Sequence, residues 1–131
     1  MYHRKLPKEY YCTVDYALDI FGGKWKPRLL CILGHNKAVR YRDLKEGMEN
    51  ISDTALADSL RELQESGIVA RRQYNEMPIR VEYSLTAKGQ TLIPVLDTIS
   101  DWAVQHSDVG IYQGRHFAQV HRASFKNKDG Q

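Results

Sequence analysis

The stretch SDTALADSLRELQESG is the feature that most restricts how this chain can fold. Leu56, Leu60 and Leu63 recur at the spacing of one helical face, which predicts an amphipathic helix with a buried leucine stripe. Ser52 is a favoured N-cap residue and Gly67 is favoured just after a helix end, so both ends are marked. Such a helix requires a core to pack against, while its opposite face remains in water.

The opposite face of this helix is polar, and at about 100° per residue its side chains project away from the leucines. Its first turn carries small residues where the backbone N–H groups lack helical partners. A shorter helix is predicted over residues 42–48, followed by a turn at 49–51. Two helices joined in this way form a helix-turn-helix, which can place its second helix in a DNA major groove. The residues expected to face DNA are Ser52, Thr54, Ala55, Asp58 and Arg61.

A β-hairpin is predicted directly after this helix. Residues 68–74 and 80–85 are rich in β-branched and aromatic side chains, and Pro78 confines the break between them to a turn. A hairpin that follows a helix-turn-helix can act as a wing along the DNA backbone and the neighbouring minor groove. The alternative is that its arginines are charges on a solvated strand. The arginines in question are Arg71, Arg72 and Arg80.

The N-terminal third adds two further helices. The apolar spacing over residues 14–21 predicts a short helix capped by Thr13, and a second helix is expected to begin near Pro27 and to end at Gly34. A short strand is expected over residues 39–41. Together with the hairpin, these elements predict a mainly α-helical fold with a small β-sheet: a winged helix-turn-helix with extra terminal helices that form a dimer interface.

The last long helix is expected to start after the N-cap Thr86, with Pro94 bending or interrupting it near its first turns. Its apolar residues cover more of its circumference than one core stripe needs, which indicates a partner helix. We therefore expect an arm over residues 1–11, a winged helix-turn-helix domain with a dimerisation helix over 12–106, and a tail over 107–131 with a helix at 111–125. The residues expected at the twofold interface are Tyr10, Tyr11, Ile99 and Trp102.

Composition narrows the functional classes. A chain of 131 residues suits one domain, and no run of 18 apolar residues predicts a membrane span, so a cytoplasmic protein is expected. The two cysteines lack the spacing of a zinc site, so neither a metal nor another cofactor is expected. Phosphate-binding glycine loops, G-x-S-x-G and H-E-x-x-H are absent from the sequence, which argues against an enzyme.

Three segments, GGKWKPRLLCIL, ISDTALADSLRELQESGIVARR and PIRVEYSLTAKGQTLIPVLDTISDW, resemble the HxlR-type branch of the MarR-like winged-helix transcription regulators. The resemblance runs from residue 12 to about residue 102. It implies a DNA-binding homodimer joined through terminal helices, a recognition helix over 52–66 and a wing over 74–80. Such a dimer would bind a pseudo-palindromic double-stranded operator. In some members of this family a redox-sensing cysteine lies close to the N-terminus, a position that Cys12 matches. The sequence does not indicate which small molecule, if any, acts as an effector.

Two hypotheses remain for Cys12. A helix N-terminus and a basic arm favour a reactive thiolate, whereas Asp15 opposes it, and the alternative is a packed, unreactive thiol. Cys31 lies inside an apolar helix and is expected to be an inert core residue. A second functional class also stays open, because Asp53 and Asp58 on the recognition face would repel phosphates. That alternative is a winged-helix module that binds proteins without specific DNA binding.

Overall fold

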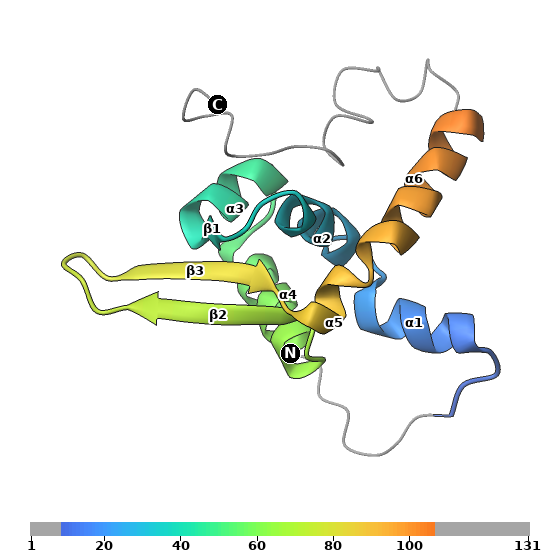
Figure 1. Cartoon of the computed structure of the whole chain (residues 1–131), viewed down its shortest axis with the longest axis horizontal. Helices are drawn as coiled ribbons and strands as arrows, with labels where there is room; N and C mark the ends of the chain where they lie inside the picture. Colours follow the sequence, from blue (N-terminus) through green and yellow to red (C-terminus); the bar gives the residue numbers. More distant parts are fainter. Residues whose placement is uncertain (1–8, 107–131) are drawn as a thin grey trace.

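The computed structural model describes residues 9–106, and Figure 1 shows a helical body from which a long β-hairpin and two helices project. The first eight residues of the expected arm and the helix expected over 111–125 lie outside the described residues. The elements in chain order are α1 (Thr13–Phe21), α2 (Lys26–Gly34), β1 (Val39–Arg40), α3 (Tyr41–Met48), α4 (Asp53–Glu65), β2 (Val69–Tyr74), β3 (Arg80–Leu85), α5 (Ala87–Gln90) and α6 (Ile93–His106).

The helix-turn-helix consists of α3 and α4, as the sequence predicts. The leucine stripe of α4 is fully buried, and Leu44 and Met48 of α3 pack in the same core. Between the helices the chain reverses through Glu49 and Asn50, whose φ angles of 53° and 51° lie in the left-handed region. Gly67 follows α4 with a φ of 77°, a conformation that costs glycine little. Local signals thus define both ends of α4.

The small sheet has the strand order β1-β3-β2 and is antiparallel throughout. The expected hairpin is confirmed, with a register that runs from Val69 opposite Leu85 to Tyr74 opposite Arg80. Tyr83 is buried against the helices and anchors one face of the sheet. The other end of the hairpin extends beyond the body as a wing (Figure 1). The fold class is therefore a winged helix-turn-helix.

The N-cap of α1 is Cys12 and not the expected Thr13. Cys12 is the last residue in extended conformation, and its Sγ accepts a hydrogen bond from the backbone N–H of Val14 at 3.4 Å. Thr13 already has helical geometry, so its hydroxyl is not placed to cap the helix. The observed N-cap is one residue before the predicted one, and this places the thiol of Cys12 at the N-terminus of α1.

The prediction of a single long helix after Thr86 is also wrong, because the structure has two helices, α5 and α6, in this part of the chain. Thr86 caps α5, with its Oγ1 accepting from the backbone N–H of Gly89 at 3.0 Å. The chain then turns at Thr91 before α6 begins at Ile93. Pro94 lacks an N–H, and its ring would clash with the carbonyl of Gln90 in a continuous helix. The predicted interruption by Pro94 is confirmed, and it is a complete break.

Candidate nucleic-acid interface

The N-terminal turn of α4 faces solvent. The Oγ of Ser52 accepts a hydrogen bond from the backbone N–H of Ala55 at 3.0 Å, so the cap predicted from the sequence is present. Ser52 and Thr54 are exposed, whereas Ala55 is half-buried and packs against the core. The first turn therefore offers small polar side chains and backbone N–H groups on a rigid helix, which is the geometry needed to enter a groove.

Both carboxylates on this face have partners within the protein. The hydroxyl of Tyr41 donates to Asp53 Oδ1 at 3.2 Å, and Lys45 Nζ lies 3.4 Å from the same oxygen. Asp58 forms an ion pair with Arg61, one turn later on α4. Burial, followed by the hydrogen bond to Asp53, raises the pKa of Tyr41, so its hydroxyl keeps the proton that it donates. These pairs reduce the negative field that DNA would meet at α4.

The three arginines of the wing do not lie together. Cross-strand partners share a face of the sheet, so Arg71, opposite Tyr83, lies on the face toward the helices. Arg72, opposite Glu82, lies on the other face, and alternation puts Arg80 there as well. Only Arg71 among the three therefore lies on the side of the sheet that carries α4.

Arg80 is held inside the wing by two carboxylates. Its Nη1 lies 2.7 Å from Glu82 and its Nη2 lies 2.8 Å from Glu76, and its guanidinium stacks 3.8 Å from the centre of the Tyr74 ring. The hydrogen bond to Glu76 leads the effects that raise the pKa of Arg80. Arg72 lies over the same Tyr74 ring at 4.6 Å. This cluster stiffens the wing and compensates the charge of Arg80.

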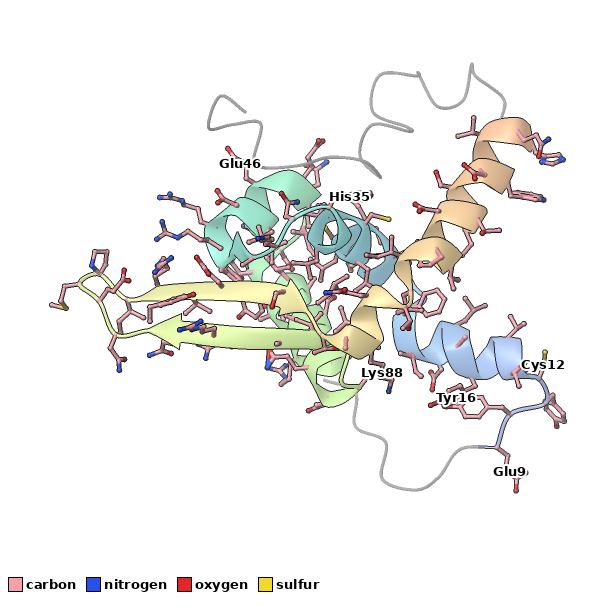
Figure 2. All side chains as sticks on the ribbon, viewed as in Figure 1. Glu9, Cys12, Tyr16, His35, Glu46 and Lys88 are labelled. Atoms are coloured by element: carbon pink, nitrogen blue, oxygen red, sulfur yellow. The ribbon has the colours of Figure 1, made fainter. Side chains whose placement is uncertain are left out.

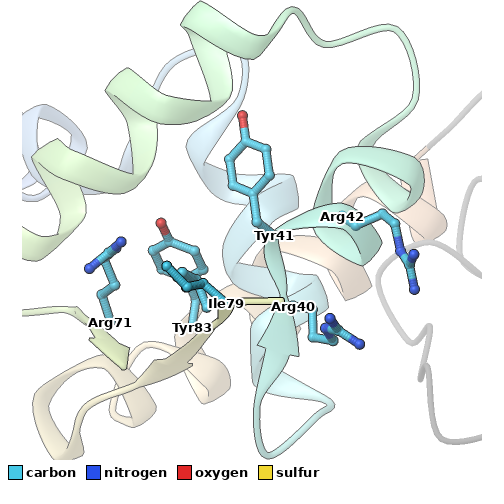
Figure 3. A pocket seen from close by; sticks show the side chains of 7 residues that line it. Arg40, Tyr41, Arg42, Arg71, Ile79 and Tyr83 are labelled. Atoms are coloured by element: carbon cyan, nitrogen blue, oxygen red, sulfur yellow. The ribbon is translucent and has the colours of Figure 1, made fainter. Parts of the chain in front are cut away.

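Two basic residues that the sequence reasoning missed lie at the junction of β1 and α3. Arg40 and Arg42 flank Tyr41, and with it they line one side of a hollow of about 420 Å³. The wing lines the other side through Arg71, Ile79, Val81 and Tyr83 (Figure 3). The signal in the sequence is the run VRYR just before the first helix of the helix-turn-helix. This run lies outside both the second helix and the hairpin, the two elements from which DNA contacts were predicted.

An apolar stripe on α6 is exposed in the single chain. Val95, Ile99 and Trp102 follow the i, i+4, i+7 spacing of one helical face and are 42%, 49% and 64% exposed. On α1, Val14 and Leu18 are also exposed, although Phe21 on the same face is buried. Both helices project from the same side of the body (Figure 1). Among the described residues these side chains form an exposed apolar surface, which we call the α1–α6 surface.

The two arm tyrosines differ in their environment. Tyr11 is fully exposed, whereas Tyr10 is half-buried and its hydroxyl donates to Asp19 Oδ2 at 2.6 Å. The ring of Tyr10 also contacts Tyr16 edge-on, with centroids 5.4 Å apart. Tyr10 thus fastens the start of the described chain to α1.

The two cysteines also differ in their exposure to solvent. Cys12 is exposed at the outer end of α1 (Figure 2). Cys31 is partly buried against the core, and burial, with a smaller effect of Asp97, raises the pKa of its thiol to about 11. Cys31 is therefore protonated at neutral pH.

Within residues 9–106 there is no group of His, Cys, Asp and Glu suited to a metal ion, and no helix long and apolar enough to cross a membrane.

A helix-turn-helix followed by an antiparallel hairpin defines the class of winged helix-turn-helix proteins. Residues 20–110 match the family described as HxlR-like helix-turn-helix, and the chain belongs to this family. It is 43% identical over 94 residues to an uncharacterized HTH-type transcriptional regulator of Methanothermobacter thermautotrophicus, a match that covers 72% of this chain and 71% of the relative. The protein is thus a DNA-binding transcription regulator of the HxlR type.

Solved structures of two redox-related regulators are similar to this chain. The redox regulator HypR in its oxidized form is 36% identical with a TM-score of 0.68, over 75% of this chain and all of HypR. The reduced form of YodB from Bacillus subtilis is 29% identical with a TM-score of 0.66, over 76% of this chain and 97% of YodB. The likeness therefore extends over almost the whole of both regulators.

Proposed function

We propose that two copies of this chain bind one pseudo-palindromic site on double-stranded DNA and regulate transcription there. The observation that carries the proposal is the exposed first turn of α4, held rigid by the Ser52 cap and by the contact of Tyr41 with Asp53. Two such helices related by a twofold axis enter successive major grooves about 34 Å apart. We assign this function to the cytoplasm, and the described chain contains no helix long and apolar enough to cross a membrane.

We assign base contacts to the exposed face of α4. Ser52 and Thr54 offer hydroxyls, Ala55 offers a methyl group for thymine, and Asp58 offers an acceptor for cytosine N4. Arg61 holds Asp58 in place and supports the position of the helix on the backbone. In the wing, Arg71 supplies phosphate or minor-groove contacts on the side of the sheet that carries α4, and Arg72 supplies them from the other face. Arg80, whose charge Glu76 and Glu82 compensate, acts by stiffening the wing.

The α1–α6 surface supports the proposal of a homodimer. Exposed Ile99 and Trp102 form one stripe on a helix that points away from the body, and Tyr11 extends the same type of surface at α1. A second copy of this chain covers the stripe without any other protein, because a twofold contact joins a surface to itself. The twofold axis then sets the separation of the two α4 helices.

We also propose that Cys12 is the residue through which an oxidant acts. The similar structures of HypR and YodB are described by their redox states, and Cys12 is the exposed thiol among the two cysteines. Two Cys12 thiols of a dimer can lose two protons and two electrons to an oxidant and form an S–S bond between subunits. Alternatively, one Cys12 thiol and a small thiol can together lose two protons and two electrons to the oxidant and form a mixed disulfide. A change at α1 alters the angle between the α4 helices. When the two α4 helices can no longer contact both half-sites at once, the affinity for DNA falls on the order of 100-fold.

The protein-binding alternative loses its main support, because the two aspartates that favoured it are paired with Lys45 and Arg61. The test is selection of bound fragments from genomic DNA under reducing and oxidising conditions, with Cys12→Ser in parallel. We expect enrichment of sites with twofold symmetry in the reduced protein, and loss of binding on oxidation in the wild type alone. No enrichment over input would refute the regulator at a specific site, and equal loss in wild type and Cys12→Ser would refute the role of Cys12.

A further inference from the structure

We infer that the hollow between the β1–α3 junction and the wing is a binding site for DNA backbone phosphates, with Arg40, Arg42 and Arg71 as its ligands. The inference rests on the proposed function and adds a contact region separate from the exposed face of α4. It assigns a role to two arginines that lie in neither the recognition helix nor the wing. Its evidence is charge, position and shape.

No carboxylate of residues 9–106 compensates the charge of the hollow. Among the described residues, Arg40, Arg42 and Arg71 form no ion pair, whereas Arg61 and Arg80 are paired with carboxylates. Arg71 donates to the neutral Gln73 Oε1 at 3.2 Å. The described lining of the hollow contains no Asp or Glu. Three guanidinium groups around one concave surface attract an anion strongly, and guanidinium matches phosphate oxygens in a bidentate geometry.

The hollow lies beside the N-terminal turn of α4. Tyr41 belongs to its lining and contacts Asp53 at the start of α4 through its hydroxyl. In Figure 3 the Tyr41 hydroxyl points toward the helix above it, with Arg40 and Arg42 on one side and Arg71 with Tyr83 on the other. When α4 enters a major groove, the strand that borders this groove must pass close to its N-terminal turn. The arginines are therefore placed for consecutive phosphates of one strand.

The shape of the hollow fits a nucleotide strand better than an isolated ion. Its volume of about 420 Å³ exceeds that of a single phosphate group, and Ile79, Val81 and Tyr83 provide an apolar floor. Such a floor can contact the carbon atoms of deoxyribose while the arginines at the rim hold the phosphates. On the described chain β1 is an edge strand of only two residues, so the junction is open to a ligand.

The test measures non-specific binding, because phosphate contacts do not depend on base sequence. The probe is a fluorescent mixed-sequence duplex of about 30 base pairs, long enough to span two successive major grooves. It is titrated at several salt concentrations with wild type, Arg42→Gln, Arg40→Gln/Arg42→Gln and Arg71→Gln. The control is Lys24→Gln, which removes one positive charge from an exposed residue in the α1–α2 loop, outside the lining of the hollow. Thermal unfolding of each variant shows that the fold is retained.

We expect the slope of log K against log salt to fall by about 0.9 for each phosphate that is no longer neutralised, which corresponds to an affinity decrease of about eightfold per phosphate at 0.1 M salt. The control should keep the wild-type slope. A double variant indistinguishable from Lys24→Gln overturns the inference.

A second measurement distinguishes a binding site for DNA from a binding site for a free anion. If inorganic phosphate at matched ionic strength raises the melting temperature of wild type but not of the double variant, while the DNA slopes agree, the hollow is a small-anion site and the inference is wrong. Failure of the regulator proposal looks different: wild type would then bind selected genomic fragments no more tightly than the mixed-sequence duplex. The comparison of slopes would still test the hollow.

Discussion

Replacing Ile99 and Trp102 together by glutamine should convert the proposed dimer into monomers. Both residues lie on the exposed stripe of α6, and glutamine is a good helix former, so the helix itself should persist. The substitution removes apolar surface that a second copy would cover. It leaves the buried Leu96, through which α6 contacts the core, unchanged.

The exposed area of Trp102 gives the size of the free-energy contribution that this substitution removes from the dimer interface. An aromatic side chain buries roughly 150–250 Å². Because 64% of Trp102 is exposed, about 100–160 Å² of it is available to a partner. At about 25 cal/mol per Å² this is roughly 2.5–4 kcal/mol per subunit, and a twofold interface contains the contribution twice. Ordering of side chains at the interface opposes part of this gain. We therefore expect the dimer dissociation constant to rise by at least about 100-fold, or roughly 3 kcal/mol.

Sedimentation velocity across a range of protein concentrations measures this change. The control is Val104→Gln, because Val104 is 50% exposed on the same helix but lies about 200° from Trp102 around its axis. DNA affinity of the double variant should fall by about 10²–10⁴-fold through loss of the second α4 helix. If the double variant sediments like wild type at every concentration, the α6 stripe is not the interface and the reasoning from exposed apolar area is wrong.

The remaining predictions concern stability and thiol chemistry. Ser52→Ala should lower the free energy of unfolding by about 1 kcal/mol through loss of the cap, whereas Ser52→Asp should retain most of it; equal urea midpoints for all three proteins would contradict the role of the cap. Leu56→Ala should cost about 2–5 kcal/mol in urea unfolding because the side chain is fully buried. Since burial raises the pKa of Cys31 to about 11, its thiolate increases only as the pH approaches that value. Iodoacetamide at about pH 8, well below that pKa, should therefore modify exposed Cys12 first, and mass spectrometry showing Cys31 labelled first would oppose this.

Much of the fold could be predicted because its signals are local. The Ser52 cap, the leucine spacing of α4 and the break around Pro78 each act within a few residues, where a hydrogen bond or one helical turn decides the conformation. The break before α6 was signalled by Pro94 in the same way. The position of the α1 cap was missed by one residue because Cys12 is not a typical capping residue, although its sulfur accepts the hydrogen bond.

The candidate site was predicted in part. Exposure of Ser52 and Thr54 followed from the helical periodicity, and alternation along β2 separates Arg71 from Arg72. The ion pair of Asp58 with Arg61 is also within reach of sequence reasoning, since residues three apart on a helix are neighbours. What the sequence left open was the direction in which each face of the hairpin points.

The tertiary structure alone decided which charges from distant parts of the chain lie together. The register of β2 with β3 places Arg71 opposite Tyr83, and pairing of β1 with β3 brings Arg40 and Arg42 to the same hollow from a distant part of the chain. Periodicity and capping are short-range effects, whereas strand pairing between distant segments depends on how the buried faces fit the helices beneath them. For this reason the residues 52–67 were sufficient to predict a recognition helix, while the basic hollow beside it appeared only when the sheet was assembled.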